Sequence, residues 1–271
     1  MDHILSFSHG KDSTAAIYVT KEILHWQLDR IIHAEVWATD TIPADLPPMM
    51  EYKAKAERII KERWGIEVEH VYATKNGKKR TYEDRLYAPY FHKTKCGILK
   101  PGMNGIYGFP SRRKPWCNSQ LKTNALEKAK RRCVSYLGIA ADEPERIARH
   151  INKPNVKLPL VEAGWTEAMC RQWCEENGLL SPIYTTATRG GCWFCHNQSV
   201  DQLRLLRKNY PEHWALMLKW DKDSPVTFHA DGHTIHDFEE RFALEDVGQI
   251  MAGDTRFRWD QIDQMSLFLE C

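Results

Sequence analysis

The sequence predicts an α/β protein with a doubly wound, mostly parallel β-sheet, followed by a mainly helical C-terminal region. Two observations carry this prediction. Short apolar runs typical of buried strands alternate with longer stretches of helical periodicity through the first half of the 271-residue chain. Strands separated by helices pair in parallel, and the helices cover the faces of the sheet. From residue 199 onward the pattern is mainly helical.

The first half of the chain supplies three strands and two helices in alternation. Strands are expected at residues 4–7, 30–39 and 67–73, and helices from residue 14 onward and over residues 50–64. Gly65 ends the second helix, because glycine readily adopts the left-handed conformation found at helix C-termini. Asp40 follows the second strand, so it is expected at the carboxyl edge of the sheet, where such folds bind ligands.

Residues 75–116 interrupt this alternation. The segment is rich in glycine, proline and aromatic residues toward its end, and a long loop in a compact domain is usually functional. We therefore expect a lid or substrate loop. Its basic residues Arg112, Arg113 and Lys114 would contact phosphate or nucleic acid, and a solvated basic loop is the alternative.

The second half of the chain predicts further elements. A helix is expected at residues 118–132, a strand at 133–139, a helix at 166–177 begun by Thr166, helical structure over 199–220, a hairpin at 226–238 and a final helix. The hairpin would turn at Asp231-Gly232. His229, His233 and His236 are then expected to be surface residues of that hairpin, because strand geometry divides them between two faces.

Charge and hydropathy exclude some classes of protein. The chain has 38 basic and 36 acidic residues, which gives no general reason to expect binding to nucleic acid or to a membrane surface. No apolar stretch approaches the length of a membrane span, and no basic region precedes an apolar run at the start. We expect a cytoplasmic protein without a membrane partner.

A polar turn between the first strand and the first helix predicts a phosphate-binding loop. It runs Ser8-His9-Gly10-Lys11-Asp12-Ser13. Backbone N–H groups at a helix start point at an anion, and the helix dipole favours negative charge there. Gly10 permits close approach, Lys11 adds a positive charge, and Asp12 is expected to cap the helix or hold Mg²⁺. The pattern is neither a Walker loop nor a dinucleotide fingerprint.

Four of the eight cysteines predict a metal site. Cys192 and Cys195 form a C-x-x-C pair, a spacing that lets two thiolates bind one metal ion. Cys117 and Cys133 would supply the other ligands of a zinc ion or a [4Fe-4S] cluster, which accept the same thiolates. The alternative for Cys133 is that of a small buried apolar residue.

Other cysteines and one histidine are expected to be reserve metal ligands or core residues. Cys96 and His196 are the reserve candidates for the fourth ligand position. Cys170 and Cys174 are four residues apart on one face of a predicted helix, and we expect them to pack in the core beside Trp173.

The phosphate-binding loop resembles the PP-loop of the adenine-nucleotide alpha-hydrolase superfamily, with His9 where glycine is usual. The order of further motifs is similar to the phosphoadenylyl-sulfate reductase family in the broad sense. These motifs are Asp40-Thr41, Tyr107-Gly108-Phe109-Pro110, Trp116-Cys117 with Leu121-Lys122, Gly138-Ile139 with Asp142, Glu143 and Arg146, Pro159-Leu160, and Gly191-Cys192-Trp193-Phe194-Cys195. The resemblance covers most of residues 3–200.

The resemblance implies a Rossmann-like fold of the alpha-hydrolase type and a set of nucleotide contacts. Residues 1–185 would be the nucleotide-binding domain, and residues 186–271 the cysteine knuckle with a helical region. An adenine nucleotide such as ATP would be held by Ser6, Ser8, His9, Gly10 and Asp40, with Gly138 and Ile139 beside the base or ribose, and Lys122 and Arg146 on phosphate or sulfate. For Arg146, an ion pair with Asp142 or Glu143 is an equally good prediction.

Three functions follow in order of preference. The first is an ATP pyrophosphatase that uses Lys11, Asp12 and Ser13 to release pyrophosphate and adenylate an acceptor, either a nucleic acid or a small molecule, for sulfur or amine transfer. The second is a thiol-dependent reductase of an adenylyl sulfate with Cys271 as nucleophile, although the chain lacks the Gly-x-His that follows this cysteine in true reductases. The third is a non-catalytic nucleotide-binding module. A homodimer is left open.

Overall fold

The computed structural model describes residues 1–93, 99–111, 113–185, 191–229, 231–254 and 257–260. The chain divides into two compact units, each built from two separate segments. The first unit comprises Met1–Tyr82 and Trp116–Cys192, and the second comprises Glu83–Pro115 and Trp193–Cys271. The division therefore differs from the predicted boundary at 185/186, because the segment after Tyr82 belongs with the C-terminal region.

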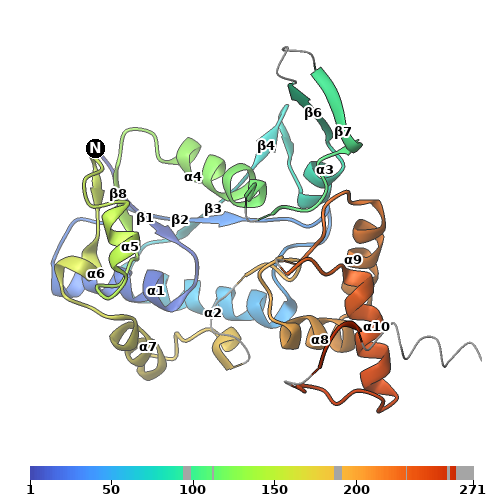
Figure 1. Ribbon diagram of the computed structural model, residues 1–271. Coiled ribbons are helices and arrows are strands. Elements are labelled where there is room, and N and C mark those ends of the chain that lie inside the picture. The colour runs from blue at the N-terminus through green and yellow to red at the C-terminus, as the bar shows by residue number, and fades with distance from the viewer. Residues whose placement is uncertain (94–98, 112, 186–190, 230, 255–256, 261–271) are drawn as a thin grey trace, which may run out of the picture. The chain divides into compact units, whose positions relative to one another are not determined.

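The first unit contains a five-stranded parallel sheet (Figure 1). Its strands are β1 (His3–Phe7), β2 (Arg30–Glu35), β3 (Val68–Tyr72), β8 (Val134–Leu137) and β9 (Val156–Lys157). They lie in the order β3-β2-β1-β8-β9, and every neighbouring pair is parallel. The predicted α/β class with a parallel sheet is confirmed, and the order is compatible with a Rossmann-like fold.

Helices cover both faces of this sheet (Figure 1). The helices α1 (Lys11–Tyr18) and α2 (Pro47–Trp64) lie on one face, and α4 (Asn124–Ala129) lies on the other. The short helices α5 (Pro144–Ala148) and α6 (Pro159–Glu162) follow β8 and β9, and α7 (Glu167–Glu176) packs against α1. The sheet is therefore doubly wound, as the sequence predicted.

Local signals set several element boundaries. Gly65 ends α2 in the left-handed conformation with φ 68°, and the side chain of Thr166 caps α7 by accepting a hydrogen bond from the amide of Met169 (3.3 Å). In contrast, β2 ends at Glu35, four residues earlier than expected. The chain turns back there, because Trp37 pairs with Pro43 in an antiparallel bridge.

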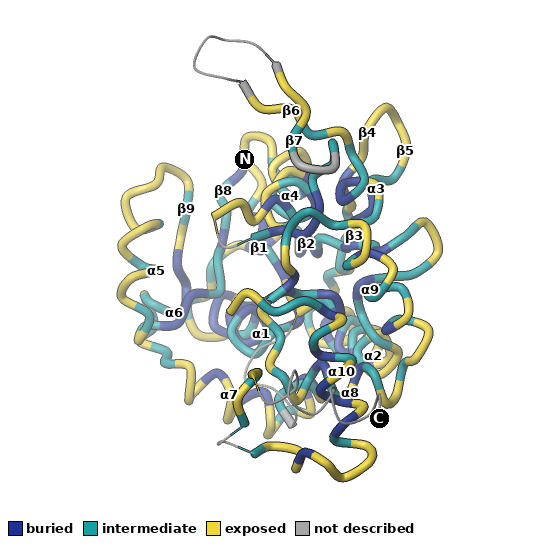
Figure 2. The backbone as a smooth tube through the Cα atoms, turned by 45° about the vertical axis from the view of Figure 1, so that its right-hand side comes forward, coloured by how far each residue is buried: buried dark blue, intermediate teal, exposed yellow. Residues whose placement is uncertain are grey.

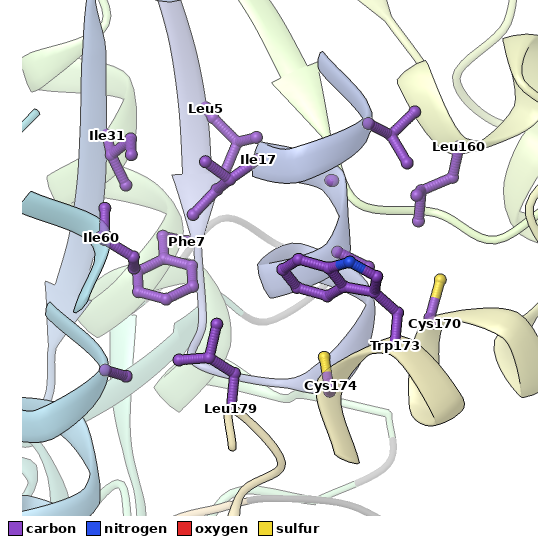
Figure 3. Close-up of a cluster of buried hydrophobic side chains, with 14 of the residues drawn as sticks. Leu5, Phe7, Ile17, Ile31, Ile60, Leu160, Cys170, Trp173, Cys174 and Leu179 are labelled. Carbon is purple, nitrogen blue, oxygen red and sulfur yellow. The ribbon is translucent and has the colours of Figure 1, made fainter. Parts of the chain in front are cut away.

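The main core of the first unit lies between the sheet and the helices α1, α2 and α7 (Figure 3). Leu5 and Phe7 of β1 meet Ile17 of α1, and the cysteines of α7 complete the cluster. Cys170 and Cys174 are fully buried, and burial raises the pKa of the Cys174 thiol to about 12. This confirms that both are core residues. A thiol with so high a pKa is an inert apolar group at neutral pH.

The predicted loop at residues 75–116 is largely regular structure. In the first unit β4 (Thr74–Lys75) and β5 (Lys78–Lys79) form a small hairpin, and α3 (Tyr82–Leu86) follows it into the second unit. There β6 (Pro89–Lys93) pairs antiparallel with β7 (Leu99–Ile106). The prediction of one long loop was wrong, because the glycine and proline of β7 hide its strand character.

The C-terminal part of the second unit is helical, as predicted, but the hairpin at residues 226–238 is wrong. Its helices are α8 (Val200–Asn209), α9 (Pro211–Asp223) and α10 (Ile235–Asp246). Thr234 and Asp237 form a capping box that starts α10 inside the predicted second strand. His229 and His233 therefore precede a helix, while His236 lies within it and contacts Asp221 (2.6 Å).

The two segments of the second unit contact each other directly. Trp220 donates its indole N–H to Glu83 (3.0 Å), and Tyr87 donates its hydroxyl to Asp223 (2.6 Å). Burial along the chain is shown in Figure 2, where β1, β2 and α1 are buried or partly buried and the β4–β5 hairpin is largely exposed. Within the described residues, no helix is both long enough and apolar enough to cross a membrane.

Candidate functional site

A cavity of about 720 Å³ lies in the first unit beside the carboxyl ends of β1 and β8. The strand order reverses between these strands, since β2 and β3 lie beyond β1 while β9 lies beyond β8. Ligands of open parallel sheets bind at such a switch point. The residues predicted from the sequence that line the cavity are Ser6, Ser8, His9, Gly10, Lys11, Asp12, Ser13, Lys122, Gly138, Arg146 and Cys192.

Hydroxyl groups shape the loop between β1 and α1. The hydroxyl of Ser13 accepts a hydrogen bond from the amide of Ser8 (3.2 Å) and donates to the carbonyl of Gly10 (3.0 Å). The amide of Thr14 bonds the same carbonyl (3.0 Å). This is the first intrahelical bond of α1, so the amides of the preceding turn have no partner within the helix. That turn is suited to an anion.

Close approach explains the glycine at position 138. A Cβ atom on Gly138 would lie 2.7 Å from Cα and 2.8 Å from N of Ser13, both backbone atoms. The first turn of α1 therefore rests directly on the end of β8. Gly138 lines the cavity, whereas Ile139 is buried and is not among the described lining residues.

Asp40 lies outside the cavity. The early end of β2 places it, exposed, at the tip of the turn between Ala38 and Ile42, where its carbonyl accepts a hydrogen bond from Lys79 (3.0 Å). The carboxylate of Asp45 lines the cavity instead. The sequence predicted β2 to run four residues further, and the earlier end of this strand accounts for the position of Asp40 away from the described lining residues.

Positive and negative side chains that line the cavity form ion pairs with each other. Lys11 Nζ lies 2.8 Å from Asp12 Oδ1 and 3.3 Å from Glu167 Oε2. Arg146 binds both carboxylate oxygens of Glu143 (2.5 and 2.7 Å), as one of the two sequence-based alternatives for this residue predicted. Asp12, Glu143 and Glu167 each bring a carboxylate oxygen to within 4.8 Å of the others.

The pKa values of Asp12 and Lys11 are both raised, for different reasons. Burial raises the pKa of Asp12, although Lys11 opposes the shift. Burial alone would lower the pKa of Lys11, but its hydrogen bond to Asp12 and the charges of Asp12 and Glu167 outweigh it, so the pKa of Lys11 is raised. Lys11 is therefore a cation whose present partners are themselves cavity residues.

His9 holds the loop to α2. Its backbone is left-handed (φ 57°), its side chain is fully buried, and its Nε2 lies 2.8 Å from Glu57 Oε1. Burial lowers the pKa of His9. A neutral ring that keeps the hydrogen bond to Glu57 carries its proton on Nε2. Its Nδ1 is buried without a hydrogen-bond partner among the described residues. Next to it, His33 contacts the carbonyl of Phe7 (2.9 Å) and Lys53 (3.0 Å).

Cys133 does not have the surroundings of a metal ligand. It is 9% exposed in an apolar cluster with Ile4 and Ile32 on the α4 face of the sheet, and its thiol donates to the carbonyl of Lys130 (3.1 Å). This environment matches the alternative of a small buried apolar residue. The sequence left both roles open, because a cysteine at the start of a strand gives no signal that separates them.

The other residues predicted as metal ligands belong to two different units of the chain. Cys117 is partly exposed at the start of the helical turn Asn118–Thr123, Cys192 lines the cavity, and Cys195 belongs to the second unit, as does the buried His196. Among the described histidines, cysteines and carboxylates of the first unit, the group that brings three ligand atoms together is acidic and contains no cysteine. Within the described residues of this unit, the cysteines are therefore not gathered into a clear metal site.

Some predicted residues lie outside the described part of the chain, and some site residues were missed. Cys96, Arg112 and Cys271 fall in undescribed segments. Glu167 and Lys53 line the cavity without having been predicted. Glu167 is the first residue after the cap Thr166, and its position at a helix start hid its role in the site. No sequence signal singles out Lys53 on α2.

Comparisons with known proteins add no further information about this site. No family model, no curated protein and no solved structure matches the chain. The function therefore has to be inferred from the cavity and its side chains.

Proposed function

We propose that the first unit binds ATP with Mg²⁺ in the large cavity, and that the chain splits it into AMP and pyrophosphate while adenylating an acceptor. The observation that carries the proposal is the loop between β1 and α1. It brings the amides of a helix start, Lys11 and a shaped backbone to the switch point of a parallel sheet. This combination binds phosphate groups in α/β proteins.

The cationic side chains of the cavity suit a triphosphate. Lys11 projects from the start of α1, Lys122 from the helical turn before α4, and Arg146 from α5. A cavity of about 720 Å³ is large enough for a nucleotide. Arginine and lysine gain most from phosphate oxygens when they are partly buried, as Lys11 is.

The acidic group fits Mg²⁺. Asp12, Glu143 and Glu167 offer hard oxygen ligands, which this ion prefers, and the ion usually shares one or two carboxylates with the phosphates of its substrate. Without a ligand these carboxylates neutralise Lys11 and Arg146. When ATP and Mg²⁺ bind, the carboxylates would exchange Lys11 and Arg146 for the magnesium ion. Lys11 and Arg146 would exchange the carboxylates for phosphate oxygens. The bound ion would supply charge neutralisation for the phosphates.

Catalysis by this site would depend on positioning and electrostatics. An acceptor oxygen attacks the α-phosphorus, a new O–P bond forms, the bond to the β-phosphate oxygen breaks, and pyrophosphate leaves with the electron pair. Lys11 and the amides of the first turn stabilise the negative charge that develops on the phosphates. The adenylated acceptor is then activated for displacement of AMP by a sulfur or nitrogen nucleophile. Ser13, predicted as catalytic, shapes the loop.

Calorimetric titration of the protein with ATP and Mg²⁺ tests the proposal. Lys11→Ala should weaken binding about 10- to 150-fold, the loss expected for a charge-assisted hydrogen bond of about 1.5–3 kcal/mol. Lys128→Ala is the matched control, because Lys128 is exposed on α4 and should leave binding unchanged. AMP and pyrophosphate formation with candidate acceptors should disappear in the Lys11 variant. Unchanged binding or turnover in that variant would refute the role of the loop.

A further inference from the structure

We propose that a second, smaller cavity of the first unit is a binding site for a small organic cation with a primary ammonium group. The cavity has a volume of about 200 Å³ and lies between α2 and the ends of β2 and β3. His33, Val36, Asp45 and Lys53 line both this cavity and the large one. The two sites are therefore direct neighbours.

One wall of the small cavity is apolar and aromatic. It is formed by Trp37, Met50, Ala54 and the ring of Pro43. Lys79 Nζ lies 3.3 Å from the centroid of the Trp37 ring, so this ring already attracts a cation. A ligand with a short apolar body and a positively charged end matches such a wall.

The charged side chains of the cavity favour a positive ligand. Glu35, Asp45 and Glu57 contribute carboxylates, and Lys53 contributes the cationic partner of Asp45. Burial holds the pKa of His33 well below its ordinary value, so this histidine adds no positive charge at neutral pH. The three carboxylates outnumber the ammonium groups of Lys53 and, at the Trp37 ring, of Lys79, and this balance disfavours an anion in the cavity.

His70 lies between two of these carboxylates. Its Nδ1 lies 2.8 Å from Glu35 Oε1 and its Nε2 lies 3.0 Å from Glu57 Oε2. An ionised carboxylate has about four lone-pair sites, so Glu35 and Glu57 can each accept from an ammonium group as well as from the ring of His70. The side chain of His70 is 35% exposed, which connects this end of the cavity with solvent.

Glu57 links the small cavity to the phosphate-binding loop. Its Oε2 faces His70, and its Oε1 accepts the hydrogen bond from the fully buried His9. A cation that binds at Glu57 therefore changes the hydrogen bonding of the residue that anchors the loop to α2. We expect binding in the two cavities to be coupled.

The charge of the cavity bears on the nucleophile of the proposed reaction, and this step rests on the proposed function. Sulfide and persulfide are anionic sulfur donors, whereas amines enter as ammonium ions. A cavity with excess negative charge next to the nucleotide selects the amine. The second substrate would then be a primary amine with a small apolar body, which binds as the ammonium ion and attacks, displacing AMP, after one of the cavity carboxylates has taken a proton from it.

Benzylamine is a suitable probe, with benzyl alcohol as its neutral counterpart of the same shape. A dry cavity of about 150 Å³ accommodates a benzene ring, so about 200 Å³ leaves room for the aminomethyl group. Calorimetry on the nucleotide-free protein should show benzylamine binding at least about tenfold more tightly than benzyl alcohol. Equal affinities would overturn the proposal.

Variants locate the bound probe. Glu35→Gln should weaken benzylamine binding at least about fivefold, and Trp37→Leu, which leaves the contacts of His9 intact, should weaken it to a similar extent. Glu62→Gln on the exposed side of α2 is the matched control and should change nothing. If the Glu35 and Trp37 variants both fold and bind benzylamine as the wild type does, the cavity is not the site.

Adding ATP separates this proposal from the proposed function. Saturating ATP should change the benzylamine affinity at least about threefold in the wild type and have no effect in Lys11→Ala. Benzylamine binding without any ATP binding would refute the proposed function and leave the cation site standing. ATP binding without benzylamine binding would refute the cation site alone.

Discussion

Replacing Gly138 by alanine tests whether the close approach of two backbones shapes the candidate site. The new methyl carbon would lie 2.7 Å from Ser13 Cα, 2.8 Å from Ser13 N and 2.9 Å from the carbonyl oxygen of Asp12. Real Cβ contacts are not found this short, and backbone atoms cannot swing aside like the end of a side chain. The first turn of α1 must therefore move by several tenths of an ångström. Overpacking of this kind costs about 1–3 kcal/mol of folding free energy.

The same movement should weaken nucleotide binding. The turn that moves contains Lys11, Asp12 and Ser13, which line the cavity, and misplacement of such groups by about 1 Å can cost 100-fold. We expect Gly138→Ala to lower the affinity for ATP at least about tenfold in calorimetric titrations. Its free energy of unfolding is measured in urea in parallel.

Gly164→Ala separates a loss of stability from an effect on the site. Gly164 has φ 68°, and no atom lies within 4 Å of the position that an added methyl group would take, so alanine there costs about 1–2 kcal/mol through backbone strain alone. Both variants should lose comparable stability, and only the Gly138 variant should lose ATP affinity. If Gly138→Ala binds ATP as tightly as the wild type, the close approach does not shape the site.

The remaining predictions concern pH, metal and the acidic group. Burial lowers the pKa of His9 and His33 in the folded state, so the unfolded chain takes up more protons below about pH 6.5. The free energy of unfolding therefore falls as the pH falls, by up to about 1.4 kcal/mol per pH unit for each histidine. Urea unfolding from pH 7 to 5 measures this, and a flat profile contradicts it. Cys133→Ala should cost about 1 kcal/mol and leave the metal content of the purified protein unchanged, as determined by elemental analysis; a loss of metal would restore Cys133 as a ligand. Glu167→Gln should weaken ATP binding in the presence of Mg²⁺ and not in its absence, because it removes a magnesium ligand and one partner of Lys11; equal loss under both conditions would contradict the magnesium assignment.

The strand–loop–helix unit at the N-terminus could be predicted from sequence because its signals are local. An apolar run, Gly10 and a helix start follow one another, and the structure has β1 and α1 at these places. Thr166 and Gly65 likewise mark helix ends by their own side-chain and backbone chemistry. Local chemistry of this kind needs no knowledge of what packs against the element.

The features that the sequence did not predict depend on tertiary contacts. The end of β2 is set by the pairing of Trp37 with Pro43, and the extent of β7 by its partner strand. Cys133 is an apolar core residue only because Ile4 and Ile32 surround it. Glu167 joins the site because α7 packs against α1, a contact between segments far apart in the chain.

The two-segment composition of each unit has a practical consequence for dissecting the protein. The second unit cannot be removed by truncation after Cys192, because Glu83–Pro115 would remain without the helices that it contacts through Glu83 and Tyr87. However, the ring centroids of Tyr82 and Trp116 lie 4.9 Å apart within the first unit, so the chain leaves this unit and returns to it at neighbouring positions. A short flexible linker from Tyr82 to Trp116 would therefore close the first unit and yield a single-unit protein with both cavities.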